Sequence, residues 1–191
     1  MSINHFESVT TKAGDEGKTS LISGERRYKS ELVFEVMGDI DELSSTMGLL
    51  RLQFGQERES HGIPQQIYQI QQTLKLVMAL VATPAVDRKP ADNKIYNEQI
   101  QTALSVLEDW EQILLQDFAF EGFIIPGAAA IPAWSDISRT VCRRAERHLV
   151  RFIHESFADH LQEALAFMNR LSDYLWVLGR YWARLLGISE T

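Results

Sequence analysis

Apolar residues recur at gaps of three and four along most of the chain, and this spacing constrains the fold more than any other feature. After Pro64 they stand at Ile67, Ile70, Leu74, Val77 and Val81. Residues at such gaps share one face of an α-helix, so this segment is expected to be an amphipathic helix. No run of alternating apolar residues is long enough to require a sheet.

Five such helices are expected, and the fold class is therefore all-α. The first covers about residues 32–53, and the second is ended by Pro84 and the stretch 87–90. Asp92 is expected to be the N-cap of the third, which continues to Phe118. Residues 121–132, "EGFIIPGAAAIP", form a loop before the fourth helix, whose buried face is expected to include Ile137. Short links between long helices favour an antiparallel bundle.

The 191 residues fit a single domain. Residues 1–31 are polar and contain Gly14, Gly17 and Gly24. We interpret them as an ordered loop, with Val9, Leu21 and Ile22 as apolar anchors. The helical bundle is expected over residues 32–187.

Composition excludes several classes of protein. The net charge of −7 argues against a nucleic-acid partner. The apolar runs are shorter than the roughly 20 residues that span a bilayer. The single cysteine excludes a disulfide framework, and the first residues do not resemble a signal peptide. We therefore expect a soluble cytoplasmic protein that does not bind membranes.

The stretch "GDEGKT" raises the question of a phosphate-binding loop. A Walker A motif would need glycine at position 12, which is Lys12, so that motif is excluded. Glycine-rich backbone beside lysine and threonine can still bind an anion. The alternative is a solvated, turn-rich loop.

The fourth helix carries "RTVCRRAER", and helical spacing places Arg139, Arg143, Glu146 and Arg147 on one face. Stacked arginines suit a phosphate-bearing ligand, since the guanidinium can bind phosphate through two hydrogen bonds. The alternative is a solvated charged face.

Other polar residues have simpler explanations. A carboxylate among Asp39, Asp41 and Glu42 of the first helix could pair with an arginine of the fourth. Asn169, inside the apolar fifth helix, could form an interhelical hydrogen bond with a partner. The histidines lack metal-ligand spacing, and Cys142 is expected to be a buried, unreactive thiol.

These stretches occur together and in order, as TKAGDEG, GERRYK, DELSS, FIIPG, RTVCRRAER and NRLSDYL. Over about residues 9–185 the chain resembles the PduO-type ATP:cob(I)alamin adenosyltransferases. The resemblance implies a five-helix bundle that forms a homotrimer, with ATP bound between neighbouring subunits. It implies transfer of the 5′-deoxyadenosyl group of ATP to the cobalt of cob(I)alamin, with release of triphosphate. Mg²⁺ is expected to bind through the ATP phosphates, with no metal ligand from the protein.

The resemblance also assigns residues to roles. The polyphosphate is expected at Thr11, Lys12, Gly14, Thr19 and Lys29. Arg143 matches the arginine at the reaction centre, with Glu146, Arg147 and Asn169 as further ATP-binding residues. Asp41 and Arg139 match a salt bridge that organises the cobalamin side, and Phe123 matches the aromatic residue that displaces the lower ligand of cobalamin.

The chain departs from the family pattern at four positions. Ala13 replaces a threonine, Ala128 and Ala129 stand where paired glycines are usual, and Asp136 replaces a histidine that the family often has. Alanine would be strained if either loop position required a positive φ. Because of these departures, an alternative function stays open: the chain could be a non-catalytic paralogue that binds ATP and corrinoid and acts as a carrier or sensor. A reductase and an adenosylcobalamin-dependent client enzyme are further possible partners, and the pathway served stays open.

Overall fold

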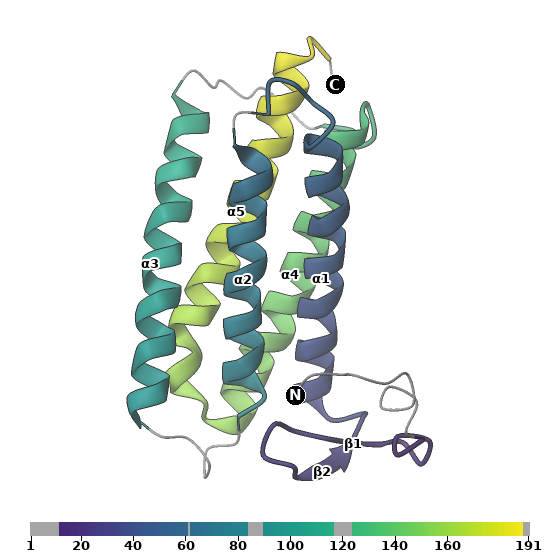
Figure 1. Cartoon of the computed structure of the whole chain (residues 1–191), viewed down its shortest axis with the longest axis vertical. Helices are drawn as coiled ribbons and strands as arrows, with labels where there is room; N and C mark the ends of the chain where they lie inside the picture. Colours follow the sequence, from purple (N-terminus) through teal and green to yellow (C-terminus); the bar gives the residue numbers. More distant parts are fainter. Residues whose placement is uncertain (1–11, 61, 84–89, 117–123, 189–191) are drawn as a thin grey trace.

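The computed structural model describes residues 12–60, 62–83, 90–116 and 124–188. Five long helices follow one another along them: α1 Leu32–Phe54, α2 Ile63–Val81, α3 Pro90–Leu115, α4 Ala130–Ser156 and α5 Gln162–Leu185. Consecutive helices run in opposite directions (Figure 1). The predicted five-helix bundle is confirmed, and α1 has nearly the expected bounds.

The helices pack in a closed ring. α1 contacts α2 and α4, α5 contacts α4 and α3, and α2 contacts α3. Because an odd number of alternating helices cannot all have antiparallel neighbours, one adjacent pair is parallel, and this pair is α3 with α5 (Figure 1). A short 3₁₀ turn, Asp159–Leu161, leads from α4 into α5.

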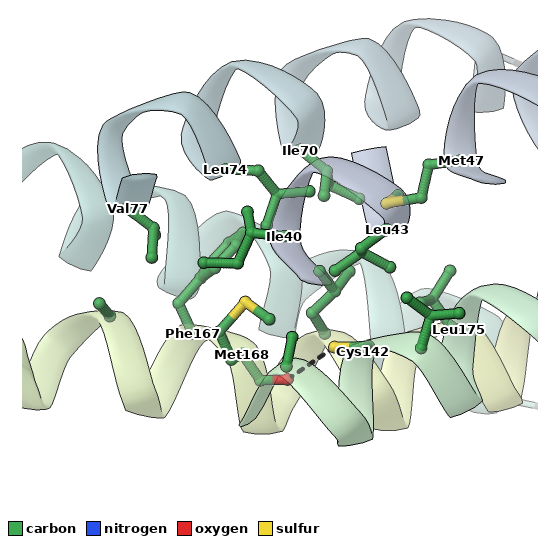
Figure 2. Packing of buried hydrophobic residues seen from close by; sticks show 14 of the residues in the cluster. Ile40, Leu43, Met47, Ile70, Leu74, Val77, Cys142, Phe167, Met168 and Leu175 are labelled. Atoms are coloured by element: carbon green, nitrogen blue, oxygen red, sulfur yellow. Dashed lines mark hydrogen bonds between the residues drawn. The ribbon is translucent and has the colours of Figure 1, made fainter. Parts of the chain in front are cut away.

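The inner faces of the helices form one apolar core (Figure 2). Its fully buried members include Ile40 and Leu43 of α1, Leu74 of α2 and Phe167 of α5. Burying a side chain of this size stabilises the fold by about 1.5–3 kcal/mol. The polar residues on the outer faces of α4 and α5 are therefore held on rigid elements.

Several expected helix ends need correction. α4 begins at Ala130, so Pro132 lies inside its first turn, where the missing amide of proline is tolerated. α3 begins at Pro90, a position at which proline is likewise tolerated. Asp92 therefore lies inside the helix and is not its N-cap. Ile137 was expected in the core but is 43% exposed. Phe118 lies outside the described residues.

The all-α class needs one addition, a two-stranded antiparallel hairpin before α1. Strand β1, Lys18–Ser20, pairs with β2, Arg26–Tyr28, with Thr19 opposite Arg27. Gly24 has a φ of 86° in the connecting turn, a conformation that glycine adopts without strain. Leu21 is buried as expected, but Ile22 is 70% exposed and anchors nothing. Val9 lies outside the described residues.

Candidate functional site

The hairpin brings Lys29 back against the turn that begins at Lys12. The Lys29 amide donates to the Gly17 carbonyl at 2.9 Å. A Cβ added to Gly14 would lie 2.9 Å from the Lys29 Nζ, so the ammonium group rests against the Gly14 backbone. Thr19 lies on β1 and is half-buried. Lys12, Gly14 and Lys29 are thus gathered at this turn, Thr19 lies on the strand that follows it, and Thr11 lies outside the described residues.

This turn and the hairpin carry lysines as well as the acidic residues Asp15 and Glu16. Among the described residues, Lys12, Lys18 and Lys29 have no ion-pair partner. Arg27, in contrast, pairs with Glu25 at 3.0 Å and with Glu31 at 3.3 Å, and its hydrogen bond to Glu25 raises the pKa of the guanidinium. Three lysines without carboxylate partners in a chain of net charge −7 suit an anionic ligand.

A second polar cluster spans α4 and α5. Arg143 and Arg147 are exposed on α4, and Arg147 Nη1 donates to the Arg143 carbonyl at 2.9 Å. Asn169 Nδ2 of α5 donates to Glu146 Oε1 at 2.8 Å. The structure therefore brings together four of the expected ATP-binding residues, and the expected interhelical hydrogen bond of Asn169 is confirmed.

Arg139 differs from the other arginines of the α4 face. It is half-buried, and its Nε lies 3.5 Å from Asp136 Oδ1, one turn earlier on the same helix. Asp41 is exposed on α1 and has no ion-pair partner within the part of the chain that the structure describes. The expected Asp41–Arg139 salt bridge is therefore not formed inside one copy of the chain. Phe123 lies outside the described residues.

The expected pairing of an α1 carboxylate with an arginine of α4 is confirmed, and the arginine is Arg144. Arg144 Nε donates to Asp39 Oδ1 at 2.9 Å, and Arg144 also contacts Glu42. His148 Nδ1 lies 2.6 Å from the other Asp39 oxygen. The hydrogen bond to Asp39 raises the pKa of the Arg144 guanidinium. This cluster joins two neighbouring helices and is separate from the expected site residues.

The sequence did not predict the buried pair of Asp136 on α4 with Arg180 on α5, whose nearest N–O distance is 2.7 Å. Asp136, which replaces a histidine that the family often has, is 4% exposed and lies between the two helices. The missed signal was Arg180 itself, since an arginine within the nearly continuous apolar stretch 174–183 requires a buried partner.

The alanines of the 124–130 loop impose no strain. Ala129 has a φ of −153°, which is extended backbone, and Ala128 is not among the positive-φ residues of the described chain. The left-handed position is Gly127, with a φ of 113°. The concern that alanine at these two positions distorts the loop is therefore removed.

Two further features lie apart from these clusters. A pocket of about 840 Å³ is lined by Arg51, Leu52, Tyr68 and other residues around the α1–α2 turn, none of them an expected site residue. Within the described residues, no group of three His, Cys, Asp or Glu side chains could hold a metal ion, and no helix has the length and apolarity needed to cross a bilayer.

Comparison with known proteins decides the family. The model of the cobalamin adenosyltransferase family matches residues 9–182. The chain belongs to the cobalamin adenosyltransferase family. It is thus a corrinoid adenosyltransferase by family, and the expected resemblance is confirmed.

Individual members of the family agree with this assignment. Human corrinoid adenosyltransferase MMAB is 37% identical over 183 residues, which cover 95% of this chain and 71% of the human protein. A cobalamin adenosyltransferase of Cupriavidus metallidurans is 33% identical, with 98% and 94% covered. A variant of the PduO-type ATP:corrinoid adenosyltransferase of Lactobacillus reuteri, complexed with cobalamin and ATP, has a TM-score of 0.81 at 27% identity, covering 96% of this chain and 97% of that one.

Proposed function

We propose that the chain transfers the 5′-deoxyadenosyl group of ATP to cob(I)alamin. The electron pair of Co(I) attacks the C5′ carbon, a Co–C bond forms, and the C5′–O bond breaks. The bond electrons leave with the oxygen of triphosphate, and no proton transfer is needed. The protein must then align the two reactants and stabilise the negative charge that grows on the leaving triphosphate. Family membership and the cation-rich surface of α4 and the hairpin support this assignment.

The turn at Lys12 is proposed to bind the triphosphate part of ATP. Lys12 and Lys29 supply charge, Gly14 leaves room for the ligand to approach the backbone, and Thr19 supplies a hydroxyl donor. Thr11 is proposed to join them. The contact of Lys29 with Gly14 supports this role, because it places an ammonium group at the turn that forms no ion pair among the described residues.

Arg143 is proposed to act at the reaction centre, where it stabilises the leaving phosphate oxygens. The single observation that carries this role is the polar cluster of Arg143, Arg147, Glu146 and Asn169 on adjoining helices. Glu146, which accepts a hydrogen bond from Asn169, carries one negative charge and so only partly offsets the two positive charges of Arg143 and Arg147.

The corrinoid side is proposed to contain Asp41, Arg139 and Phe123, within a homotrimer whose sites lie between subunits. Asp41 is exposed and unpaired within the described part of one chain, which fits a partner from a neighbouring subunit. Phe123 would exclude the lower ligand of the corrinoid. A reductase that supplies Co(I) and a client enzyme that takes the coenzyme are proposed partners, and the cytosol is the proposed compartment.

Mg²⁺ is proposed to arrive with the nucleotide. Within the described residues, no group of three His, Cys, Asp or Glu side chains could hold a metal ion, and the lysines of the hairpin region would repel a cation. The phosphate oxygens of ATP are therefore the suitable ligands. When bound, Mg²⁺ would neutralise part of the phosphate charge, while the lysines and arginines orient the triphosphate.

The test is to mix the protein with MgATP and cob(I)alamin under anaerobic, strongly reducing conditions and to follow the corrinoid spectrum. The proposal expects a light-sensitive adenosylcobalamin product and one triphosphate for each product formed. Tight binding of MgATP and corrinoid without conversion would instead establish the carrier or sensor function. That alternative has lost part of its support, because Ala128 and Ala129 lie in ordinary backbone conformations.

A further inference from the structure

Asp136 is fixed by a two-point ion pair in the interface between α4 and α5. Arg180 Nη1 and Nη2 donate to Asp136 Oδ1 and Oδ2 at 3.3 and 2.7 Å. The side chains of Arg180 and Asp136 are only 3% and 5% exposed. Two parallel hydrogen bonds between planar groups fix orientation as well as distance. The Asp136 carboxylate is therefore held in one position.

The two helices approach each other closely at this level. A Cβ added to Gly179 would lie 3.0 Å from the Ser135 Cβ, so the glycine permits a short separation between α5 and α4. The next residue along α5 is Arg180 and the next along α4 is Asp136. The guanidinium of Arg180 also lies 6.0 Å from the ring centre of Trp176, one turn earlier on α5. Backbone approach and ring contact together hold the pair in place.

The same carboxylate also contacts Arg139. Its Oδ1 accepts from Arg180 and lies 3.5 Å from Arg139 Nε. Arg139 Nε is buried, whereas 27% of the Arg139 side chain is exposed. Arg139 thus lies at the edge of the buried pair, with its Nε buried beside Asp136 and part of its side chain exposed.

We propose that Asp136 is a positioning residue that sets the orientation of Arg139 toward the corrinoid. This inference rests on the proposed function of the site. A free arginine side chain samples many rotamers and loses this freedom on binding, so an arginine oriented in advance binds its partner at lower entropic cost. Arg180 fixes Asp136, Asp136 lies 3.5 Å from the Nε of Arg139, and the exposed part of Arg139 presents its positive charge to the corrinoid side.

The competing explanation is a purely structural ion pair that joins α4 to α5. A structural role predicts that loss of Asp136 lowers stability and affects both substrates alike. A positioning role predicts a selective effect on the corrinoid that depends on Arg139. The two roles therefore differ in a double-mutant cycle.

The experiment compares wild type, Asp136→Asn, Arg139→Ala and the combined variant in anaerobic turnover, with cob(I)alamin and MgATP varied in separate series. Asp136→Asn is expected to raise the KM for cob(I)alamin about tenfold, as for the loss of one charge-assisted contact, with the KM for ATP changed less than about twofold. In the Arg139→Ala background, Asp136→Asn should add no further change. Asp39→Asn, which breaks the separate α1–α4 cluster, is the matched control and should leave the KM for cob(I)alamin unchanged.

A second variant covers the case in which Asp136→Asn fails to fold. Asp136→Asn combined with Arg180→Gln removes both buried charges and leaves two amides that can hydrogen-bond, and it should raise the KM for cob(I)alamin by a similar factor. An unchanged KM for cob(I)alamin in a folded variant, or an equal effect with and without Arg139, would overturn the positioning role while the enzyme function stands. A wild-type protein that forms no adenosylcobalamin would refute the proposed function and this inference with it.

Discussion

Asn169 donates a 2.8 Å hydrogen bond to Glu146 and so links the polar surfaces of α5 and α4 beside Arg143. Met168, the preceding residue on α5, is fully buried, and its carbonyl accepts from the Cys142 thiol at 3.2 Å. The Asn169 side chain thus starts from a backbone that is fixed in the core (Figure 2 shows the Cys142–Met168 contact). This connection transmits the rigidity of the core to the proposed ATP site.

Replacing Asn169 by alanine tests the importance of this link. The change removes an amide donor and leaves both Glu146 oxygens free to pair with the neighbouring arginines. We expect kcat/KM for ATP to fall about tenfold or more, as for the loss of a hydrogen bond to a charged group. Stability should change little because Asn169 is exposed. Steady-state kinetics with ATP varied measures the effect, and wild-type values would argue against a role for Asn169 in the site.

Gly14→Ala tests the contact between the hairpin turn and Lys29. The new Cβ would lie 2.9 Å from Lys29 Nζ, so the flexible end of that side chain must move away. We expect weaker MgATP binding in equilibrium titration, with an unchanged melting temperature. Gly38→Ala is the control, because nothing lies within 4 Å of a Cβ there and alanine favours a helix. Equal ATP affinities for the two variants would contradict the proposed role of the turn.

Glu111 makes stability depend on pH. Burial raises the pKa of this carboxyl, and the nearby Arg170 guanidinium only partly opposes the effect. The folded state therefore keeps its proton at a pH where the unfolded state has lost it, and stability falls as pH rises from the ordinary pKa of a glutamic acid through the raised pKa. Glu111→Gln should be more stable than wild type at neutral pH, and the difference should vanish in acid. Urea unfolding across this range measures it, and an advantage that persists at low pH would contradict the assignment.

The Cys142 thiol should be unreactive in the native protein. It is fully buried, and burial raises its pKa well above the usual value for a thiol. Because the thiolate is the reactive form, a thiol reagent at pH 8 should label Cys142 only after unfolding. Quantitative labelling of the native protein at the rate of a free thiol would show that the α4–α5 interface opens readily.

The helices could be predicted from the sequence because each presents its apolar face at regular spacing. The β1–β2 hairpin could not, since its strands, Lys18–Ser20 and Arg26–Tyr28, are three residues each and mostly polar. Spacing placed Arg139 with Arg143 on one exposed face, but spacing does not show which partner a neighbouring helix offers. Asp136 draws Arg139 inward. Asp39 binds Arg144, and helical spacing alone did not show which arginine of α4 would pair with a carboxylate of α1.

Arg143 is the residue on which the proposed chemistry depends most, and its replacement tests the account most directly. The measurement is the rate of adenosylcobalamin formation from MgATP and cob(I)alamin by Arg143→Ala, with Arg151→Ala as control. Arg151 is an exposed arginine of the same helix that pairs with Glu155 at 2.8 Å, outside the proposed site. The account predicts a loss of about a hundredfold or more for Arg143→Ala, as for removal of one donor to a developing oxyanion, and wild-type turnover for Arg151→Ala. Equal rates for the two variants would contradict the placement of the reaction at this face of α4.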